Sequence, residues 1–209
     1  MNRSAMMNTI RRFSAITAIC ALLAACNPAP SGELGPSPDG VDLRGASIGG
    51  DFNLTSNKGN PVSWGDFSGQ YRMVYFGFAF CPDICPTDVS RASRGLAQFE
   101  AASPELGAKV QPIFITVDPE RDDVAAIDEF VGNFHPRLIG LTGSREAIDQ
   151  TIANFGVTAI KGQVAENGSY DFEHSSFTYL FDPDGKPLGI IPTDKGPAGV
   201  AAELAQWVR

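Results

Sequence analysis

The chain has 209 residues, of which 43% are hydrophobic and 19% are charged, and its formal net charge is −8 at pH 7. This length and this composition are those of one globular domain with a hydrophobic core, preceded by a short leader. The acidic balance argues against binding to a nucleic-acid backbone, because such binding requires clustered Lys and Arg side chains that displace counterions.

The first 25 residues have the pattern of a secretory signal. Arg11 and Arg12 precede residues 13–25, an uncharged apolar run about half as long as a bilayer-spanning helix requires. The run ends in Leu23-Ala24-Ala25-Cys26, which resembles the lipobox of bacterial lipoproteins, in which the cysteine is acylated. We therefore expect residues 1–25 to be removed and Cys26 to hold the protein at the membrane, on the periplasmic side, through its lipid. The alternative is a plain signal peptide with an unmodified cysteine.

Residues 26–48 are rich in Pro, Gly and Ser and show no hydrophobic periodicity. We expect a flexible tether there, followed by one domain over residues 49–209. Of the four cysteines of the chain, one lies in the leader and Cys26 would be blocked by lipid. Cys81 and Cys85 are then the only free thiols in an oxidising compartment.

Hydrophobic periodicity and turn residues predict alternating strands and helices along the domain. Strands are expected over residues 49–55, 62–64, 71–80, 110–117, 137–141, 177–181 and 188–191, and helices over 86–102, from Asp122 or Asp123 to 131, over 145–155 and over 197–208. This order requires parallel strands joined by helices, with an antiparallel hairpin at one edge. With a cysteine pair at the first strand-to-helix turn, the domain resembles the thioredoxin fold, an α/β fold with a central mixed sheet and flanking helices.

The two cysteines follow a buried strand, and Pro86 can begin a helix directly after Cys85. At a helix N-terminus, the helix dipole and the free N–H groups favour the thiolate, which exchanges disulfides and binds soft metals. Three residues separate Cys81 from Cys85, a spacing that permits a disulfide and also leaves room for an ion between the sulfur atoms. A purely structural disulfide is a weaker alternative, because closing so short a loop stabilises a protein by only about 2 kcal/mol.

A metal held by two thiolates takes a third ligand, and the chain has two histidines. His135 lies in a loop between a helix and a strand, where we expect it to face solvent. His174 precedes the predicted strand 177–181, and in a thioredoxin-like fold the loop that enters this strand faces the cysteine turn. His174 is therefore the expected third ligand. Two thiolates and one imidazole suit Cu(I), or Cu(II) if a further ligand joins, whereas zinc would require four ligands or an open water position.

Several separated motifs follow one another in a fixed order along the domain. They are Phe76-Gly77 with Cys81-Pro82-Asp83-Ile84-Cys85-Pro86-Thr87, then Asp118-Pro119-Glu120-Arg121-Asp122, then His174-Ser175 with Tyr179-Leu180, and finally Asp182-Pro183-Asp184-Gly185. Together they resemble the motifs of the Sco/SenC family of copper chaperones, and the resemblance covers nearly the whole domain.

The resemblance implies that Cys81, Cys85 and His174 bind one copper ion per chain. It also implies a metallochaperone rather than an enzyme, which delivers copper to the CuA centre of cytochrome c oxidase subunit II or reduces the cysteines of that centre. Its further partner would be a periplasmic copper donor or a thiol reductase. Asp83 and Asp118 are candidates for outer contacts to the metal, although capping of backbone N–H groups in turns is the favoured explanation of both residues.

Two other functions fit part of the pattern. A general thiol-disulfide oxidoreductase would use Cys81 as nucleophile and Cys85 as the resolving thiol, but such enzymes commonly have a cis-proline before the strand facing the cysteines. Residues 157–175 contain no proline, and His174 stands in that neighbourhood. A peroxiredoxin-like peroxidase is the second alternative, because Cys85-Pro86-Thr87-Asp88 is similar to the segment around a peroxidatic cysteine. That family has Thr three positions earlier, where this chain has Pro82.

Overall fold

The computed structural model describes residues 35–209, so the predicted signal segment and the predicted lipidation site, Cys26, lie outside the described residues. The helices are α1 (Ile84–Ala102), α2 (Pro104–Gly107), α3 (Val124–Val131), α4 (Arg145–Asn154) and α5 (Gly196–Trp207), with 3-10 helices at Trp64–Phe67 and Thr193–Lys195. The strands are β1 (Val41–Asp42), β2 (Asn53–Ser56), β3 (Pro61–Ser63), β4 (Tyr71–Gly77), β5 (Val110–Thr116), β6 (Ile139–Thr142), β7 (Ala159–Lys161), β8 (Phe172–His174), β9 (Thr178–Phe181) and β10 (Pro187–Ile191).

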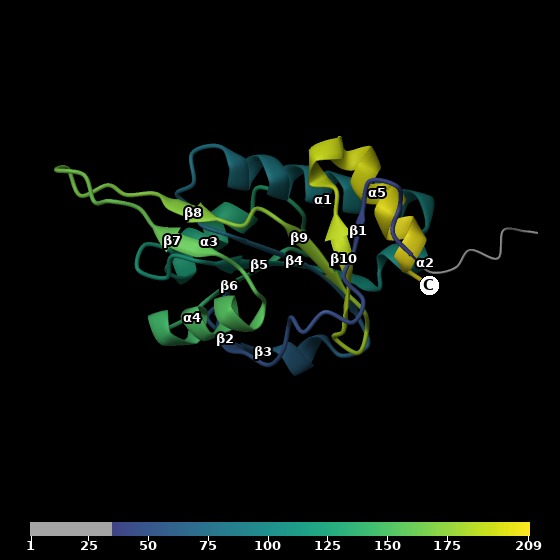
Figure 1. Cartoon of the computed structure of the whole chain (residues 1–209), viewed down its shortest axis with the longest axis horizontal. Coiled ribbons are helices and arrows are strands. Elements are labelled where there is room, and N and C mark those ends of the chain that lie inside the picture. The colour runs from purple at the N-terminus through teal and green to yellow at the C-terminus, as the bar shows by residue number, and fades with distance from the viewer. Residues whose placement is uncertain (1–34) are drawn as a thin grey trace, which may run out of the picture. The chain divides into compact units, whose positions relative to one another are not determined.

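Eight of these strands form one sheet in the order β1-β10-β9-β4-β5-β6-β2-β3 (Figure 1). The three central neighbours β4, β5 and β6 run parallel to one another, and all the other pairs are antiparallel. Each parallel connection passes through a helix, because parallel neighbours cannot be joined by a tight turn. The predicted central mixed sheet with flanking helices, a thioredoxin-like arrangement, is therefore confirmed.

The helices cover the sheet with two apolar clusters. One cluster packs α1 and α5 against β4 and β9, and Figure 1 shows these two helices side by side. Gly95 of α1 permits the close approach, since a Cβ there would lie 2.4 Å from the Cβ of Val200 in α5. The larger cluster contains the phenylalanines of β4 and β5, the inner faces of α3 and α4, and both cysteine side chains. The cysteine pair is thus part of the main core.

Two of the predicted helix starts agree with the structure in detail. The carboxylate of Asp123 accepts a hydrogen bond from the N–H of Ala126 at 2.8 Å, and the hydroxyl of Ser144 accepts one from the N–H of Ala147 at 3.1 Å. These are N-cap bonds that satisfy free donors in the first turns of α3 and α4.

The segment before residue 49, which composition assigned to the tether, is paired with the domain from residue 37 onward. The N–H of Ser37 donates to the buried carboxylate of Glu203 at 2.9 Å, and β1 pairs with β10 through Val41 and Ile190. The reason is that β10 would otherwise leave an open sheet edge, which proteins commonly cover. The short pairing has too few residues to produce a hydrophobic pattern in the sequence.

A second sheet, which the sequence did not predict, is formed by β7 and β8 alone. Ala159 pairs with His174 and Lys161 pairs with Phe172. Figure 1 shows the loop of this hairpin extending away from the eight-stranded sheet. Within residues 35–209, no helix is both long enough and apolar enough to cross a membrane.

Candidate metal centre

The cysteines lie where β4 gives way to α1. The strand ends at Gly77, a turn follows in which the N–H of Cys81 donates to the carbonyl of Phe78 at 3.2 Å, and the helix begins at Ile84. The helix thus begins two residues before Pro86, the predicted first residue, and Cys85 lies in the first turn of α1. Its N–H group points to the sulfur atom of Cys81 at 3.4 Å. Both side chains are buried, Cys81 with 9% of its surface exposed and Cys85 with none.

His174, the last residue of β8, completes the group. Its Nε2 lies 3.2 Å from the sulfur atom of Cys85, and its Nδ1 lies 3.1 Å from the carbonyl oxygen of Ser175. Since a carbonyl oxygen can only accept, Nδ1 donates there, and the neutral ring then presents a free lone pair at Nε2. The two sulfur atoms and the imidazole nitrogen all lie within 4.8 Å of one another. The structure therefore brings together the three residues that the sequence selected.

Burial sets the protonation states of this group. Burial raises the pKa of the Cys85 thiol, and a hydrogen bond with Cys81 raises it further. Burial also lowers the pKa of His174. Burial of Cys85 thus opposes the thiolate that a helix N-terminus favours. At neutral pH the group consists of a thiol and a neutral imidazole beside the second cysteine, and a cation that binds there must displace a proton.

Aromatic rings form the walls around the imidazole. The rings of Tyr75 and Phe78 meet the His174 ring edge to face, with centroid distances of 6.2 and 5.9 Å. The Tyr75 hydroxyl is buried beside Cys85 and Asp88, and burial, followed by the neighbouring Cys85, raises its pKa. The donor set is therefore soft, dry and compact, and it fits Cu(I) on the chemistry of its atoms. Sequence reasoning missed Tyr75, which reads as an ordinary strand residue.

The two aspartates proposed as outer contacts occupy different surroundings. Asp83 is exposed at the start of α1, and its side chain caps no backbone N–H group. Asp118 is completely buried, accepts a hydrogen bond from the Tyr170 hydroxyl at 3.1 Å and is paired with Arg121. Neither carboxylate belongs to the compact group of three ligand atoms, which leaves their outer role a prediction.

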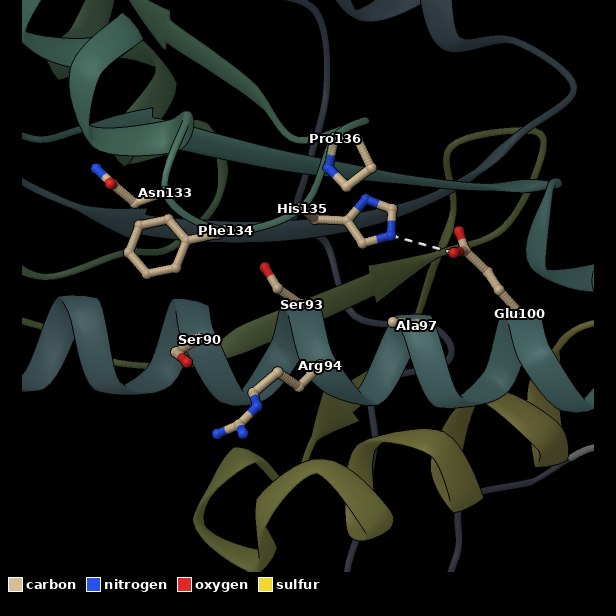
Figure 2. A pocket seen from close by; sticks show the side chains of 9 residues that line it. All are labelled: Ser90, Ser93, Arg94, Ala97, Glu100, Asn133, Phe134, His135 and Pro136. Carbon is tan, nitrogen blue, oxygen red and sulfur yellow. Dashed lines mark hydrogen bonds and ion pairs between the residues drawn. The ribbon is translucent and has the colours of Figure 1, made fainter.

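The prediction that His135 faces solvent is wrong. Only 6% of its surface is exposed, and its Nε2 lies 3.2 Å from the Glu100 carboxylate of α1 (Figure 2). Its Nδ1 accepts a hydrogen bond from the N–H of Arg137 at 3.2 Å. His135 lines a surface pocket between α1 and the loop that precedes β6 (Figure 2), and the volume of this pocket is about 420 Å³. Local sequence could not reveal this burial, since the partner lies 35 positions away.

Asp122 lies beside the cysteine turn, whereas its position in the sequence suggested a helix cap. Its carboxylate accepts hydrogen bonds from the N–H of Ala79 at 2.8 Å and from the Thr116 hydroxyl at 2.6 Å. Burial raises the pKa of Asp122 to about 6. Because Ala79 lies two positions before Cys81, the carboxylate holds the backbone that enters the cysteine turn. The motif of residues 118–122 was the available signal, but its contacts could not be assigned without the fold.

Comparisons with known proteins agree with this geometry. The protein "SCO2 homolog, mitochondrial" of Mus musculus is 48% identical over 144 residues, which cover 68% of this chain and 56% of the relative. The "SCO1 homolog, mitochondrial" of Homo sapiens is 35% identical over 164 residues, which cover 78% of this chain and 53% of the relative. The chain thus spans about half the length of the curated relatives it matches.

Solved structures show the same relationship. The crystal structure of Arabidopsis thaliana ScoI with copper bound matches with a TM-score of 0.70 at 34% identity, and the match covers 76% of this chain and 97% of the ScoI chain. The solution structure of apo Sco1 from Thermus thermophilus has a TM-score of 0.70 at 33% identity, with coverages of 81% and 96%. The SCO1/SenC family model matches residues 41–209, a range that contains both cysteines and His174. The chain therefore belongs to the SCO1/SenC family.

Proposed function

We propose that this protein binds one Cu(I) ion through Cys81, Cys85 and His174 and carries it as cargo. The observation that carries the proposal is the convergence of two sulfur atoms and one free imidazole nitrogen within 4.8 Å, from segments about ninety positions apart. Soft thiolates with one imidazole prefer Cu(I), and the group offers too few ligands for a closed zinc site. A family member with copper bound, 34% identical, supports the same assignment.

Loading exchanges protons for metal. The Cys85 thiol gives up its proton as its sulfur binds the ion, while the neutral imidazole of His174 binds through Nε2 without losing one. The hydrogen bond from Nδ1 to the carbonyl of Ser175 keeps the ring oriented throughout. The bound ion supplies a soft, one-electron redox centre. The buried thiol makes loading depend on pH, with tighter binding as pH rises.

The acceptor is the CuA centre of cytochrome c oxidase subunit II, and the protein works at the periplasmic side, anchored by lipid at Cys26. The sequence motifs and the lipobox-like segment support this part of the proposal. A periplasmic copper donor, or a thiol reductase that keeps Cys81 and Cys85 reduced, would act before it.

Thiol reduction is the second candidate function, because both cysteines are free and adjacent. In that reaction the two thiols of Cys81 and Cys85 become a disulfide and transfer two electrons and two protons to the disulfide of the acceptor. Metal delivery and thiol reduction use the same sulfur atoms, so the two functions are distinguished by the role of His174, which only the copper reaction requires.

The test is an anaerobic titration of the reduced protein with Cu(I) in the presence of a competing chelator. We expect one ion per chain, at least about tenfold weaker binding in His174→Ala, and no binding after oxidation of the cysteines. His135→Ala is the matched control, since it removes the other histidine and should leave the Cu(I) affinity unchanged. Equal affinities for His174→Ala and wild type would remove the histidine from the site, and efficient reduction of a CuA-domain disulfide by that variant would favour the second candidate.

A further inference from the structure

The two halves of the metal centre have unequal support. Cys81 lies in the turn between β4 and α1, and Cys85 lies in the first turn of α1, both inside the main core. His174 lies on the β7–β8 hairpin, which forms a separate two-stranded sheet. A two-stranded hairpin is at best marginally stable in water, so side-chain contacts must hold His174 in place.

The ring of Phe172 in β8 packs against Phe78 at a centroid distance of 5.8 Å. The segment between β5 and α3 provides the polar contacts. The guanidinium of Arg121 lies over the ring of Tyr170 with its carbon 3.8 Å from the ring centroid, and its Nη1 donates to the Tyr170 carbonyl at 2.9 Å. The Tyr170 hydroxyl donates to Asp118 at 3.1 Å, and Asp118 also pairs with Arg121. Lys161 of β7 lies 4.0 Å from the same ring and bonds to Glu120 at 2.5 Å.

Burial decides which of these contacts matters most. The Lys161–Glu120 pair is exposed, with 38% and 52% of the side-chain surfaces accessible, and such pairs stabilise little. In the Arg121–Asp118 pair the accessible fractions are 25% and zero. Arg121 therefore combines a largely buried ion pair, a ring stack and a backbone hydrogen bond at one point of the hairpin.

The same segment holds the other half of the centre as well. The carboxylate of Asp122, the neighbour of Arg121, accepts a hydrogen bond from the N–H of Ala79 in the turn that leads to Cys81. One short stretch of backbone thus fixes the cysteine turn on one side and the histidine hairpin on the other.

We propose that Arg121, acting on Tyr170 together with Asp118, is the positioning residue that holds His174 at the two cysteines. This inference rests on the proposed function for its copper-binding consequence, while the positioning itself is a property of the metal-free protein. Arg121 does not contact the ligand atoms, but its guanidinium also lies over the rings of Phe78 and Phe80, at 5.5 and 5.6 Å, in the turn that leads to Cys81. A double-mutant cycle therefore has to separate an effect through His174 from an effect through the cysteine turn.

The first measurement is amide hydrogen exchange in the reduced, metal-free protein. Arg121→Lys keeps the positive charge beside Asp118 but loses the planar stack and its fixed hydrogen-bond geometry. We expect the paired amides of β7 and β8 to exchange at least about tenfold faster, with β4 and β5 unchanged. Arg145→Lys is the matched control, because Arg145 also lies near Asp118, at 3.9 Å, and bonds to the carbonyl of Val117.

The second measurement is a double-mutant cycle on Cu(I) affinity. Arg121→Lys should weaken binding about tenfold in the wild-type background and have no further effect in His174→Ala. Tyr170→Phe, which keeps the ring but loses the bond to Asp118, should loosen the hairpin in the same direction, and this milder variant decides the question if Arg121→Lys does not fold.

The proposal would be overturned if the amides of β7 and β8 exchanged at the same rate in Arg121→Lys as in Arg145→Lys. It would also be overturned if the losses of Cu(I) affinity caused by Arg121→Lys and His174→Ala were additive. If His174→Ala alone leaves the Cu(I) affinity unchanged, the proposed ligand set fails. Amide exchange then still decides whether Arg121 holds the hairpin.

Discussion

A methyl group at Gly77 would press on the metal centre without removing any ligand. Gly77 is the last residue of β4, and a Cβ there would lie 3.0 Å from the sulfur atom of Cys85, 2.9 Å from Tyr75 Cε1 and 3.1 Å from Phe114 Cε2. These three side chains are almost completely buried, so none of them can turn toward solvent. Overpacking of this kind costs about 1–3 kcal/mol, and we expect Gly77→Ala to lose that much unfolding free energy.

The assay is urea unfolding of the reduced, metal-free variant, followed by the Cu(I) competition titration. Displacement of the Cys85 sulfur should weaken Cu(I) binding by about tenfold, which is the usual size of an effect from a residue behind the ligands. Gly65→Ala is the control, because its Cβ would meet only the Ser63 hydroxyl at an ordinary 3.7 Å and should change stability by less than about 0.5 kcal/mol. Wild-type stability and affinity in Gly77→Ala would show that the sulfur does not rest on β4 as described.

Two further substitutions test the surroundings of the core. Gly185→Ala should lower the unfolding free energy in urea by about 2 kcal/mol or more, because Gly185 has a φ of 84° and its Cβ would lie 2.7 Å from Trp64 Nε1. Gly59→Ala is the control, since Gly59 has a φ of 77° with open space around it, and its loss of stability measures the cost of the backbone conformation alone. Asp122→Asn should gain stability relative to wild type between pH 4 and pH 7, by about 3 kcal/mol. The pKa of Asp122 is raised from 3.8 to about 6, so the cost of burying its ionised form is absent below the lower value and complete above the higher one. A constant difference between the two proteins over this pH range would contradict the assignment.

Much of the fold was predictable because its signals are local. Buried central strands are continuous apolar runs, and Asp123 and Ser144 each stand directly before a helix whose N–H group they bind. His174 was predictable for a different reason, because the fold decides which loop faces the cysteine turn. Once the first strand-to-helix turn was recognised, the position of the histidine before its strand was sufficient.

The failures involve partners that are distant in the sequence. His135 has the local sequence of an exposed turn residue, and its burial depends on Glu100 in another element. Asp122 and Asp123 are neighbours with equal capping propensity, yet only Asp123 caps α3, while Asp122 faces the cysteine turn. The β7–β8 hairpin is exposed along most of its loop, and each of its strands has only three residues. Ala159 and Phe172 pack against the main core, but two apolar residues are too short a pattern to predict a hairpin.

This division of support has a consequence for the proposed delivery of copper. The cysteine turn is fixed by the main core and by the helix that begins at Ile84, whereas His174 is fixed through a hairpin outside the main sheet. Displacing a sulfur atom would disturb the packing of β4 and α1, whereas displacing the imidazole requires the hairpin to leave residues 118–122 and to break the ring contact of Phe172 with Phe78. Local opening is easiest where few buried apolar contacts must be broken. In the proposed site, His174 is therefore the ligand whose departure costs least, and a copper acceptor that approaches the hairpin side would meet an ion still held by two sulfur atoms.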